Sequence, residues 1–241
     1  MPISDTAVDS AGATAPEKQV VFTVAYGGFL EGEPRSATLQ AIGDLRRLGI
    51  KCFLITGLSK GDLLEAPELG AAFDGYCLEG GAQWGSWENL VGPANAHVVM
   101  AAADRAEQAG VKVQRRRASF TCGLDALEAV QAVAGECLVK PRRDIVNVLP
   151  PGLDKGLGLE AILGQFGMRA AHAVCLAATE DDVPLLESAD IALVPADADA
   201  PAKQAADAVL ASTGAAAVLE ACARLARGDW RPTIANARPG L

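Results

Sequence analysis

Short apolar runs alternate with amphipathic stretches from residue 20 onward. The run VVFTVA at residues 20–25 is rich in β-branched residues and ends at a glycine pair, which predicts a buried parallel strand and a tight turn. Residues 36–48 carry apolar positions at helical spacing, and Gly49 follows them as a helix C-terminal glycine. Strands are also expected at 50–55 and 73–78, with a short helix at 62–72 between them. This order predicts βαβ units in a parallel sheet.

The same alternation returns after residue 150. It predicts helices at 155–166, 183–188, 201–210 and 215–227, and strands at 173–177 and 191–194. The segment between these two parts, at about residues 83–147, has a different pattern of apolar and polar positions. It offers either a helix at 94–109 or a strand at 97–100, then the segment 111–120, a helix at 124–134, and strand candidates at 137–139 and 145–148. We therefore expect a doubly wound, Rossmann-like α/β core at 19–82 and 148–241, an inserted α+β cap at 83–147, and a polar tail at 1–18.

Composition and charge narrow the possible classes of function. Of the 241 residues, 50% are hydrophobic and 21% are charged, which excludes a disordered chain. The net charge of −9 argues against a nucleic-acid partner, since polyphosphate binding needs a basic surface. No apolar run approaches the roughly 18 residues of a membrane span, and the N-terminus has no basic or apolar leader, so we expect no membrane partner. The six scattered cysteines contain no Cys-x-x-Cys pair, which predicts reduced thiols in a cytoplasmic protein and no zinc site.

Five short blocks carry a resemblance to a known family. In chain order they are Phe22–Leu30 (FTVAYGGFL), Leu54–Gly57 (LITG), Glu79–Ala82 (EGGA), Pro150–Gly156 (PPGLDKG) and Ala177–Leu186 (AATEDDVPLL). Together they resemble the motifs of haloacid dehalogenase-like phosphatases, and the insert has the position of that superfamily's type-2 cap. The resemblance covers about residues 20–225. It points to the branch of sucrose-phosphate, mannosyl-phosphoglycerate and trehalose-phosphate phosphatases.

The catalytic groups of that family have no counterpart in this sequence. In the family, one aspartate attacks phosphorus and a second, two residues later, handles the leaving-group proton. A magnesium ion is held by the first aspartate and by an aspartate of the last block. Those positions read Val24, Tyr26 and Ala178 here, so we expect no catalytic residue and no metal site. An aliphatic side chain offers no nucleophile or oxygen ligand, and a phenol with an ordinary pKa of about 10 is a poor proton shuttle. These changes would leave Lys155 without its usual acidic neighbours.

A few polar positions of the motifs remain. By resemblance, Thr56, Gly57 and Lys155 would hold a phosphate, and a hydroxyl at a strand end and an ammonium at a helix start both suit an anion. Alternatively, Thr56 caps the next helix and Lys155 is a solvated surface residue. Asp181 and Asp182 are either a residual acidic site or the N-terminal cap of a helix.

Two basic clusters lie in the expected cap, at residues 115–117 and at Lys140, Arg142 and Arg143. They either reach a phosphorylated or acidic ligand or form a solvated face, which is the usual role of a charge run.

Three functions follow from these observations. The first is a phosphatase-like protein that has lost phosphoryl transfer and acts by binding a phosphorylated or acidic small molecule, or a protein partner. The second is an active magnesium-dependent sugar-phosphate phosphatase with a non-standard site, for which Glu31, Glu33 and Asp182 are the nearest acids. Magnesium is expected as a cofactor only in this second case. The third is a structural subunit that docks on another protein.

Overall fold

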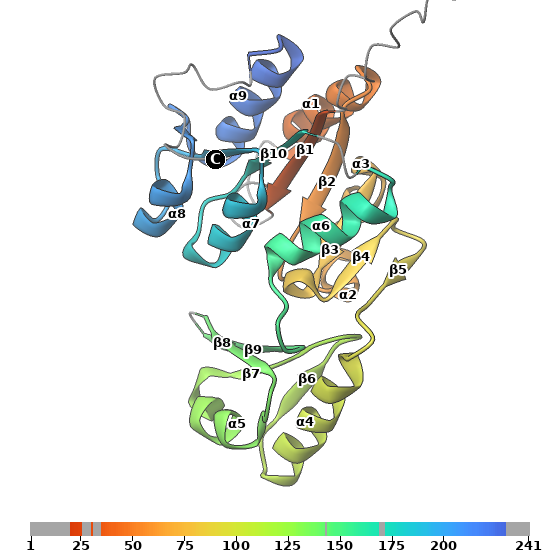
Figure 1. Ribbon diagram of the computed structural model, residues 1–241, viewed down its shortest axis with the longest axis vertical. Helices are drawn as coiled ribbons and strands as arrows, with labels where there is room; N and C mark the ends of the chain where they lie inside the picture. The colour runs from red at the N-terminus through yellow and green to blue at the C-terminus, as the bar shows by residue number, and fades with distance from the viewer. Residues whose placement is uncertain (1–19, 26–29, 31–34, 143, 169–171, 230–241) are drawn as a thin grey trace, which may run out of the picture.

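The computed structural model describes residues 20–25, 30, 35–142, 144–168 and 172–229. It contains a large core with a smaller domain at one end (Figure 1). The expected tail at 1–18 lies outside the described residues, as do Tyr26, Glu31, Glu33 and Arg143.

The core is built on one sheet with the strand order β12-β11-β10-β1-β2-β3-β4-β5. Its six strands from β12 to β3 are parallel, and β4 and β5 add an antiparallel edge. Val24 of the central β1 is paired with Leu176 on one side and Leu54 on the other. The strands are β1 (Val20–Ala25), β2 (Lys51–Ile55), β3 (Gly75–Leu78), β4 (Gln83–Gly85), β5 (Leu90–Val91), β10 (His172–Leu176), β11 (Ile191–Val194) and β12 (Ala208–Val209).

Helices cover both faces of this sheet. One face packs against α1 (Arg35–Arg47), α2 (Lys60–Leu63), α3 (Leu69–Ala72) and α9 (Gly214–Ala226). The other packs against α6 (Lys155–Gln165), α7 (Val183–Ser188) and α8 (Ala200–Ala205). Successive side chains of a strand point to opposite faces, so Phe22 and Val24 enter the first layer while Val21 and Ala25 enter the second. The expected α/β fold with a Rossmann-like parallel sheet is confirmed.

The smaller domain is an antiparallel sheet with helices on one face, and we call it the cap. The strand order is β6-β7-β9-β8, with β6 (Val113–Arg115), β7 (Phe120–Gly123), β8 (Leu138–Pro141) and β9 (Ile145–Leu149). Phe120, Val146 and Val148 pack in one apolar cluster with residues of α4 (Ala96–Gln108) and α5 (Leu127–Val133). The opposite face of the sheet is turned toward the core (Figure 1).

Two of the expected domain boundaries are wrong. Residues 83–91, expected in the cap, form β4 and β5 and continue the core sheet, because Tyr76 and Cys77 of β3 pair with Gly85 and Trp84. Residues 148 and 149, expected in the core, complete the cap strand β9 instead, where Val148 pairs with Phe120 and Val139. A strand belongs to the sheet whose strands it pairs with, which local composition does not reveal.

Two of the expected helices are also wrong in part. The helix expected at 62–72 is divided into α2 and α3, and Pro67 lies between them, where it cannot continue a helical hydrogen-bond ladder. The alanine-rich helix expected at 201–210 ends at Ala205. Ala208 and Val209 then pair with Leu193 and Val194 as the edge strand β12, so tertiary pairing overrides the helix propensity. Between the alternatives at 94–109, the structure has the helix α4.

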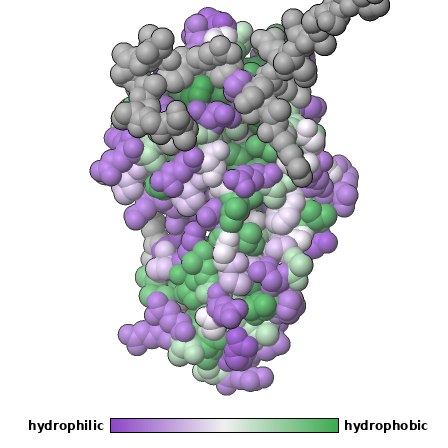
Figure 2. All heavy atoms as spheres, in the orientation of Figure 1, coloured by the Kyte–Doolittle hydropathy of each residue, from purple (hydrophilic) through white to green (hydrophobic). Residues whose placement is uncertain are grey.

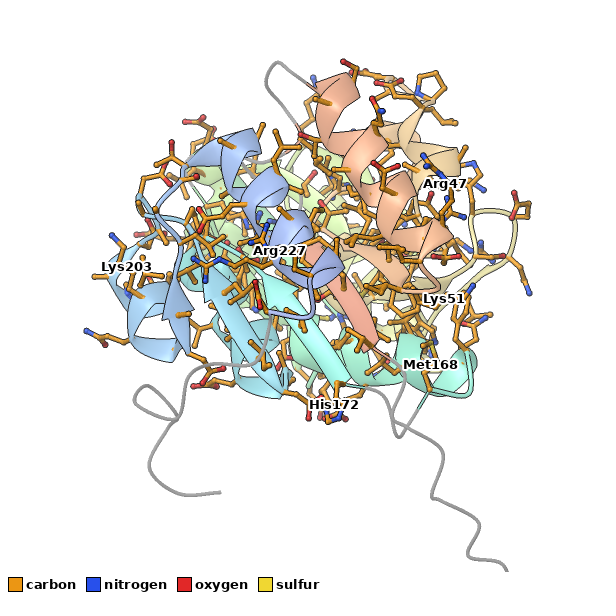
Figure 3. All side chains as sticks on the ribbon, turned by 90° about the horizontal axis from the view of Figure 1, so that it is seen from above. Arg47, Lys51, Met168, His172, Lys203 and Arg227 are labelled. Carbon is orange, nitrogen blue, oxygen red and sulfur yellow. The ribbon has the colours of Figure 1, made fainter. Side chains whose placement is uncertain are left out.

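The carboxyl ends of the parallel strands point toward the cap. Figure 3 views the core from its far end, where Lys51 at the start of β2 and His172 at the start of β10 are seen. In open α/β sheets, ligands bind beyond the carboxyl ends of the strands, which here is the side that the cap covers. On the face shown in Figure 2, hydrophobic residues appear as separate patches among hydrophilic ones. Within the described residues, no helix is both long enough and apolar enough to span a bilayer.

Candidate functional site

A pocket lies between the carboxyl ends of the core strands and the cap, with an empty volume of about 340 Å³ that includes its open side. Both domains contribute to its wall. The core supplies Gly57, Glu79, Gly80, Lys155 and Asp181, and the cap supplies Arg116, Ser119, Lys140, Arg142, Asn147 and Leu149. Of the site residues predicted from sequence, the structure thus brings Gly57, Lys155 and Asp181 together. Thr56 and Asp182 lie behind them and do not line the pocket.

Lys155 begins α6, and Asp154 caps this helix by accepting a hydrogen bond from Leu157 N at 2.9 Å. Its side chain is buried and its Nζ donates to Oδ1 of Asp182. Lys155 therefore has an acidic neighbour, Asp182, in place of the ones expected to be lost at Val24 and Ala178, and the alternative that Lys155 is solvated is wrong. The acidic partner comes from the turn after β10, four residues beyond Ala178.

Asp182 also forms a capping box with Thr179. Its Oδ2 accepts hydrogen bonds from Thr179 N at 3.1 Å and from Thr179 Oγ1 at 2.7 Å. Burial acts to raise the pKa of Asp182, but the Lys155 ammonium and the hydrogen bonds from Thr179 outweigh it and hold that pKa below its ordinary value. Asp182 is thus part of a helix N-terminal cap, as one of the two alternatives predicted. Its ion pair with Lys155 supports the floor of the pocket.

Gly57 is one of the core residues that the cap contacts. Its carbonyl oxygen accepts a hydrogen bond from Arg116 Nη1 at 2.8 Å. A Cβ on this residue would lie 3.2 Å from Nη1 of Arg142, so only a glycine leaves this guanidinium full room. Thr56, just before it, is buried, and its Oγ1 accepts from Leu58 N at 3.1 Å. Thr56 does not cap the next helix, because Ser59 does so by accepting from Asp62 N.

Glu79 links the two domains from a strained backbone position that sequence reasoning did not single out. Its φ is +52°, which is the left-handed region that a residue with a Cβ rarely adopts. Its buried carboxylate accepts hydrogen bonds from Ala118 N at 3.0 Å and from Ser119 Oγ at 2.7 Å, both in the cap. The only sequence signal was the Glu79–Ala82 turn. The conformation of this turn aims a core carboxylate at the cap backbone and fixes the cap above the pocket.

Two cap arginines enter the pocket with carboxylate partners from the core. Arg116, whose side chain is 9% exposed, pairs with Asp62 at 3.0 Å between Nη2 and Oδ2. Arg142 pairs with Asp181 at 2.6 Å between Nε and Oδ2. The basic residues of the cap thus fall into two groups, those that face the pocket and those on the solvated surface. Arg116, Lys140 and Arg142 face the pocket, whereas Arg115 pairs with Asp104 and Glu107 on the cap surface.

Lys140 differs from the other basic residues of the pocket. Within the described part of the chain, no carboxylate lies within 4.0 Å of its ammonium. Burial lowers its pKa, and the nearby Lys155 and Arg142 act in the same direction, while Asp181 and Asp154 oppose them. Among the described residues, the pocket therefore has three basic side chains with a carboxylate partner, and the half-buried ammonium of Lys140 has none.

The described residues near Val24 and Ala178, where the resemblance would place a magnesium ion, do not fit one. Val24 packs in the apolar layer beside Phe22, Leu54 and Leu176, and Ala178 offers only a methyl group. Both carboxylate oxygens of Asp182 accept hydrogen bonds from Lys155 and Thr179. A hard cation needs several free oxygen ligands, and among the described residues no group of three or more His, Cys, Asp or Glu side chains could hold a metal.

Comparison with known proteins agrees with this architecture. The sequence profile of the haloacid dehalogenase-like hydrolases matches residues 126–222. The fold is that of the haloacid dehalogenase-like hydrolases. No curated protein matches the chain by sequence.

Solved structures superpose on the core and the cap together. A COF-like hydrolase of this superfamily from Plasmodium vivax has a TM-score of 0.73 and 14% identity, over 87% of this chain and 96% of that one. A phosphatase of the haloalkanoate superfamily from Bacteroides thetaiotaomicron has a TM-score of 0.71 and 15% identity, over 91% and 100% of the two chains. The sucrose-phosphatase from Synechocystis, solved with sucrose and phosphate, has a TM-score of 0.64 and 16% identity, over 87% and 99%.

Proposed function

We propose that this haloacid dehalogenase-like chain binds a phosphorylated small molecule between its core and its cap and has lost phosphoryl transfer. The observation that carries the proposal is the convergence of Lys155, Arg116 and Arg142 around Gly57. Guanidinium and ammonium groups are the side chains that recognise phosphate, and a partly dehydrated pocket strengthens their attraction for an anion. The phosphatases among the similar structures support a phosphate ester as the ligand class.

The loss of turnover is supported by the apolar residues Val24 and Ala178, which stand where the resemblance to the family would place carboxylates. Val24 is fully buried in the apolar layer, and Ala178 follows β10 where the family carries a magnesium ligand. Among the described residues, the two carboxylates that line the pocket are engaged elsewhere, Asp181 with Arg142 and Glu79 with the cap backbone, so neither is free to attack a phosphate. The six buried, unpaired cysteines support a reducing compartment such as the cytoplasm as its location.

Calorimetric titration with inorganic phosphate tests the binding half of the proposal. We expect saturable binding that Arg142→Gln weakens about tenfold, since the substitution removes one charged donor worth about 1.5 kcal/mol or more. The matched control is Arg117→Gln, because Arg117 is an exposed cap arginine outside the pocket. Equal weakening by both variants, or no binding at all, would contradict a phosphate site in this pocket and would favour a role in docking another protein.

A turnover assay tests the other half. The protein is incubated with magnesium, an aryl phosphate and a panel of sugar phosphates, and released phosphate is measured. We expect no release above a sample without protein. Magnesium-dependent release that Lys155→Ala abolishes would instead establish the alternative, an active sugar-phosphate phosphatase that uses an acid outside the family pattern.

A further inference from the structure

The face of the cap sheet turned toward the core carries two polar side chains that the proposed phosphate site does not use. Lys140 on β8 and Asn147 on β9 are directly paired across the two strands. Their neighbours Val146 and Val148 point the other way, into the cluster beneath the cap helices. Because side chains alternate along a strand, Lys140 and Asn147 lie side by side on the pocket face, and both line the pocket.

Asn147 is mostly buried, and its side chain has no hydrogen-bond partner among the described residues. The residue is only 9% exposed, yet its amide atoms are not fully enclosed and stay open to the pocket that the residue lines. An amide that reaches the pocket and has no partner in the protein is free to hydrogen-bond a ligand there. By contrast, Thr121, its partner on β7, donates to Gln114 Oε1 at 3.3 Å. The missing partner of Asn147 is thus expected to come from the pocket.

The same argument applies to Lys140. Its ammonium is half-buried and has no carboxylate within ion-pair distance among the described residues, unlike Lys155, Arg116 and Arg142. Lys140 contributes an ammonium to the pocket face of the cap sheet. Asn147, beside it, contributes an amide N–H and an amide oxygen. This set matches an oxyanion that has a hydroxyl close to it.

We propose that Lys140 and Asn147 form a subsite for a carboxylate, so that the ligand is a phosphorylated hydroxy acid that bridges core and cap. The proposal rests on the proposed phosphate site around Gly57. A carboxylate fits better than a second phosphate because one ammonium balances one negative charge, whereas a phosphate dianion would leave an uncompensated charge in a half-buried place. The hydroxyl would donate to the amide oxygen of Asn147.

A matched pair of probes tests this subsite. 3-Phosphoglycerate and glycerol 3-phosphate carry the same phosphate ester, but only the first has a carboxylate. By titration calorimetry we expect the chain to bind 3-phosphoglycerate about tenfold more tightly. Lys140→Met should abolish this preference, because it should weaken the binding of 3-phosphoglycerate about tenfold more than it weakens the binding of glycerol 3-phosphate. Asn147→Asp, which keeps the shape of the side chain, should reduce the preference by repulsion, while Lys112→Met serves as an exposed cap control.

Other results of these titrations would contradict either the carboxylate subsite or the proposed phosphate site. Equal binding of the two probes, or a preference that survives Lys140→Met, overturns the carboxylate subsite and leaves the phosphate site in place. A gain in affinity from fructose 6-phosphate to fructose 1,6-bisphosphate that exceeds the gain from the carboxylate overturns the choice of carboxylate over phosphate. Failure to bind inorganic phosphate and both glycerol-based probes overturns the proposed function itself.

Discussion

Arg142 of the cap and Asp181 of the core form an ion pair across the domain boundary, with 2.6 Å between Nε and Oδ2. Both residues line the pocket, and about one third of each side chain is exposed. The Asp181 carboxylate is thus paired with the Arg142 guanidinium, which is the group proposed to bind a phosphate. A phosphate ligand and Asp181 are therefore expected to compete for Arg142, so ligand binding should weaken this ion pair between cap and core.

This competition predicts the effect of Asp181→Asn. The substitution frees Arg142, and an exposed ion pair is worth up to about 1 kcal/mol, so the affinity for inorganic phosphate should rise about fivefold. Asp197→Asn is the matched control, because Asp197 is an exposed carboxylate that does not line the pocket. Titration calorimetry of the three proteins measures the effect. Weaker binding in Asp181→Asn would show that Asp181 helps to hold the ligand rather than competing with it.

The buried pair of Lys155 and Asp182 predicts a large loss of stability when one member is removed. Lys155→Met and Asp182→Asn each leave an unpaired buried polar or charged group, and we expect each to lower the free energy of unfolding by about 3–5 kcal/mol. The double variant should lose less than the sum of the two. Urea unfolding measures all three proteins. Asp229→Asn, which removes a pair whose side chains are 61% and 64% exposed, should change stability by under about 0.5 kcal/mol.

The same pair predicts how stability depends on pH. The folded-state pKa of Asp182 is held below its unfolded value of about 3.9, so its contribution is fully present above that value and is lost as pH falls through the folded pKa. In Lys155→Met, burial acts without the ammonium and raises the pKa of Asp182. The stability gap between wild type and Lys155→Met should therefore narrow from pH 7 to pH 4. A gap that stays constant over this range would rule out ionised Asp182 as its cause.

Two glycines of the site predict opposite outcomes for the same substitution. At Gly57 an added Cβ meets only the flexible end of Arg142, so Gly57→Ala should weaken phosphate binding several-fold and change the melting temperature little. At Gly81 the φ is +109° and a Cβ would lie 2.1 Å from the backbone oxygen of Asp154. Gly81→Ala should therefore lower the free energy of unfolding by at least about 2 kcal/mol. The reverse order of the two melting temperatures would contradict these local geometries.

The cysteines predict slow thiol chemistry in the native protein. All six are free and buried, and burial raises the pKa of Cys77 and Cys175 to about 12. The reactive thiolate is therefore scarce at neutral pH. An aromatic disulfide reagent should modify the native chain slowly and all six thiols rapidly after unfolding in urea. Two or more thiols that react at once in the native protein would show that the core opens near them.

Much of the fold could be predicted from sequence because its signals are local. The apolar runs of β1 and β11 coincide with the strands observed, since a strand buried on both faces must be apolar throughout. The strand β12 could not be predicted. Ala208 and Val209 are too few to show a pattern, and only the pairing with β11 makes them a strand.

The site could be predicted only where one motif contains it. Gly57 and Lys155 each lie in a recognisable block, and both line the pocket. The ion pair of Lys155 with Asp182 and the reach of Glu79 into the cap join residues that are 27 and 39 positions apart. No sequence spacing encodes such a contact, because it depends on how the sheet is ordered and where the cap sits.

The pairing of β1 with β10 has a consequence for how the chain acquires its structure during synthesis. Val20 and His172 are neighbours in the sheet, so the centre of the core cannot form until the ribosome has passed residue 172. The cap elements, from Ala96 to Leu149, are contiguous in sequence and pair only among themselves. All residues of the cap are therefore synthesised before the core can be completed. The strand β1 cannot pair with β10 until after the cap sequence has left the ribosome.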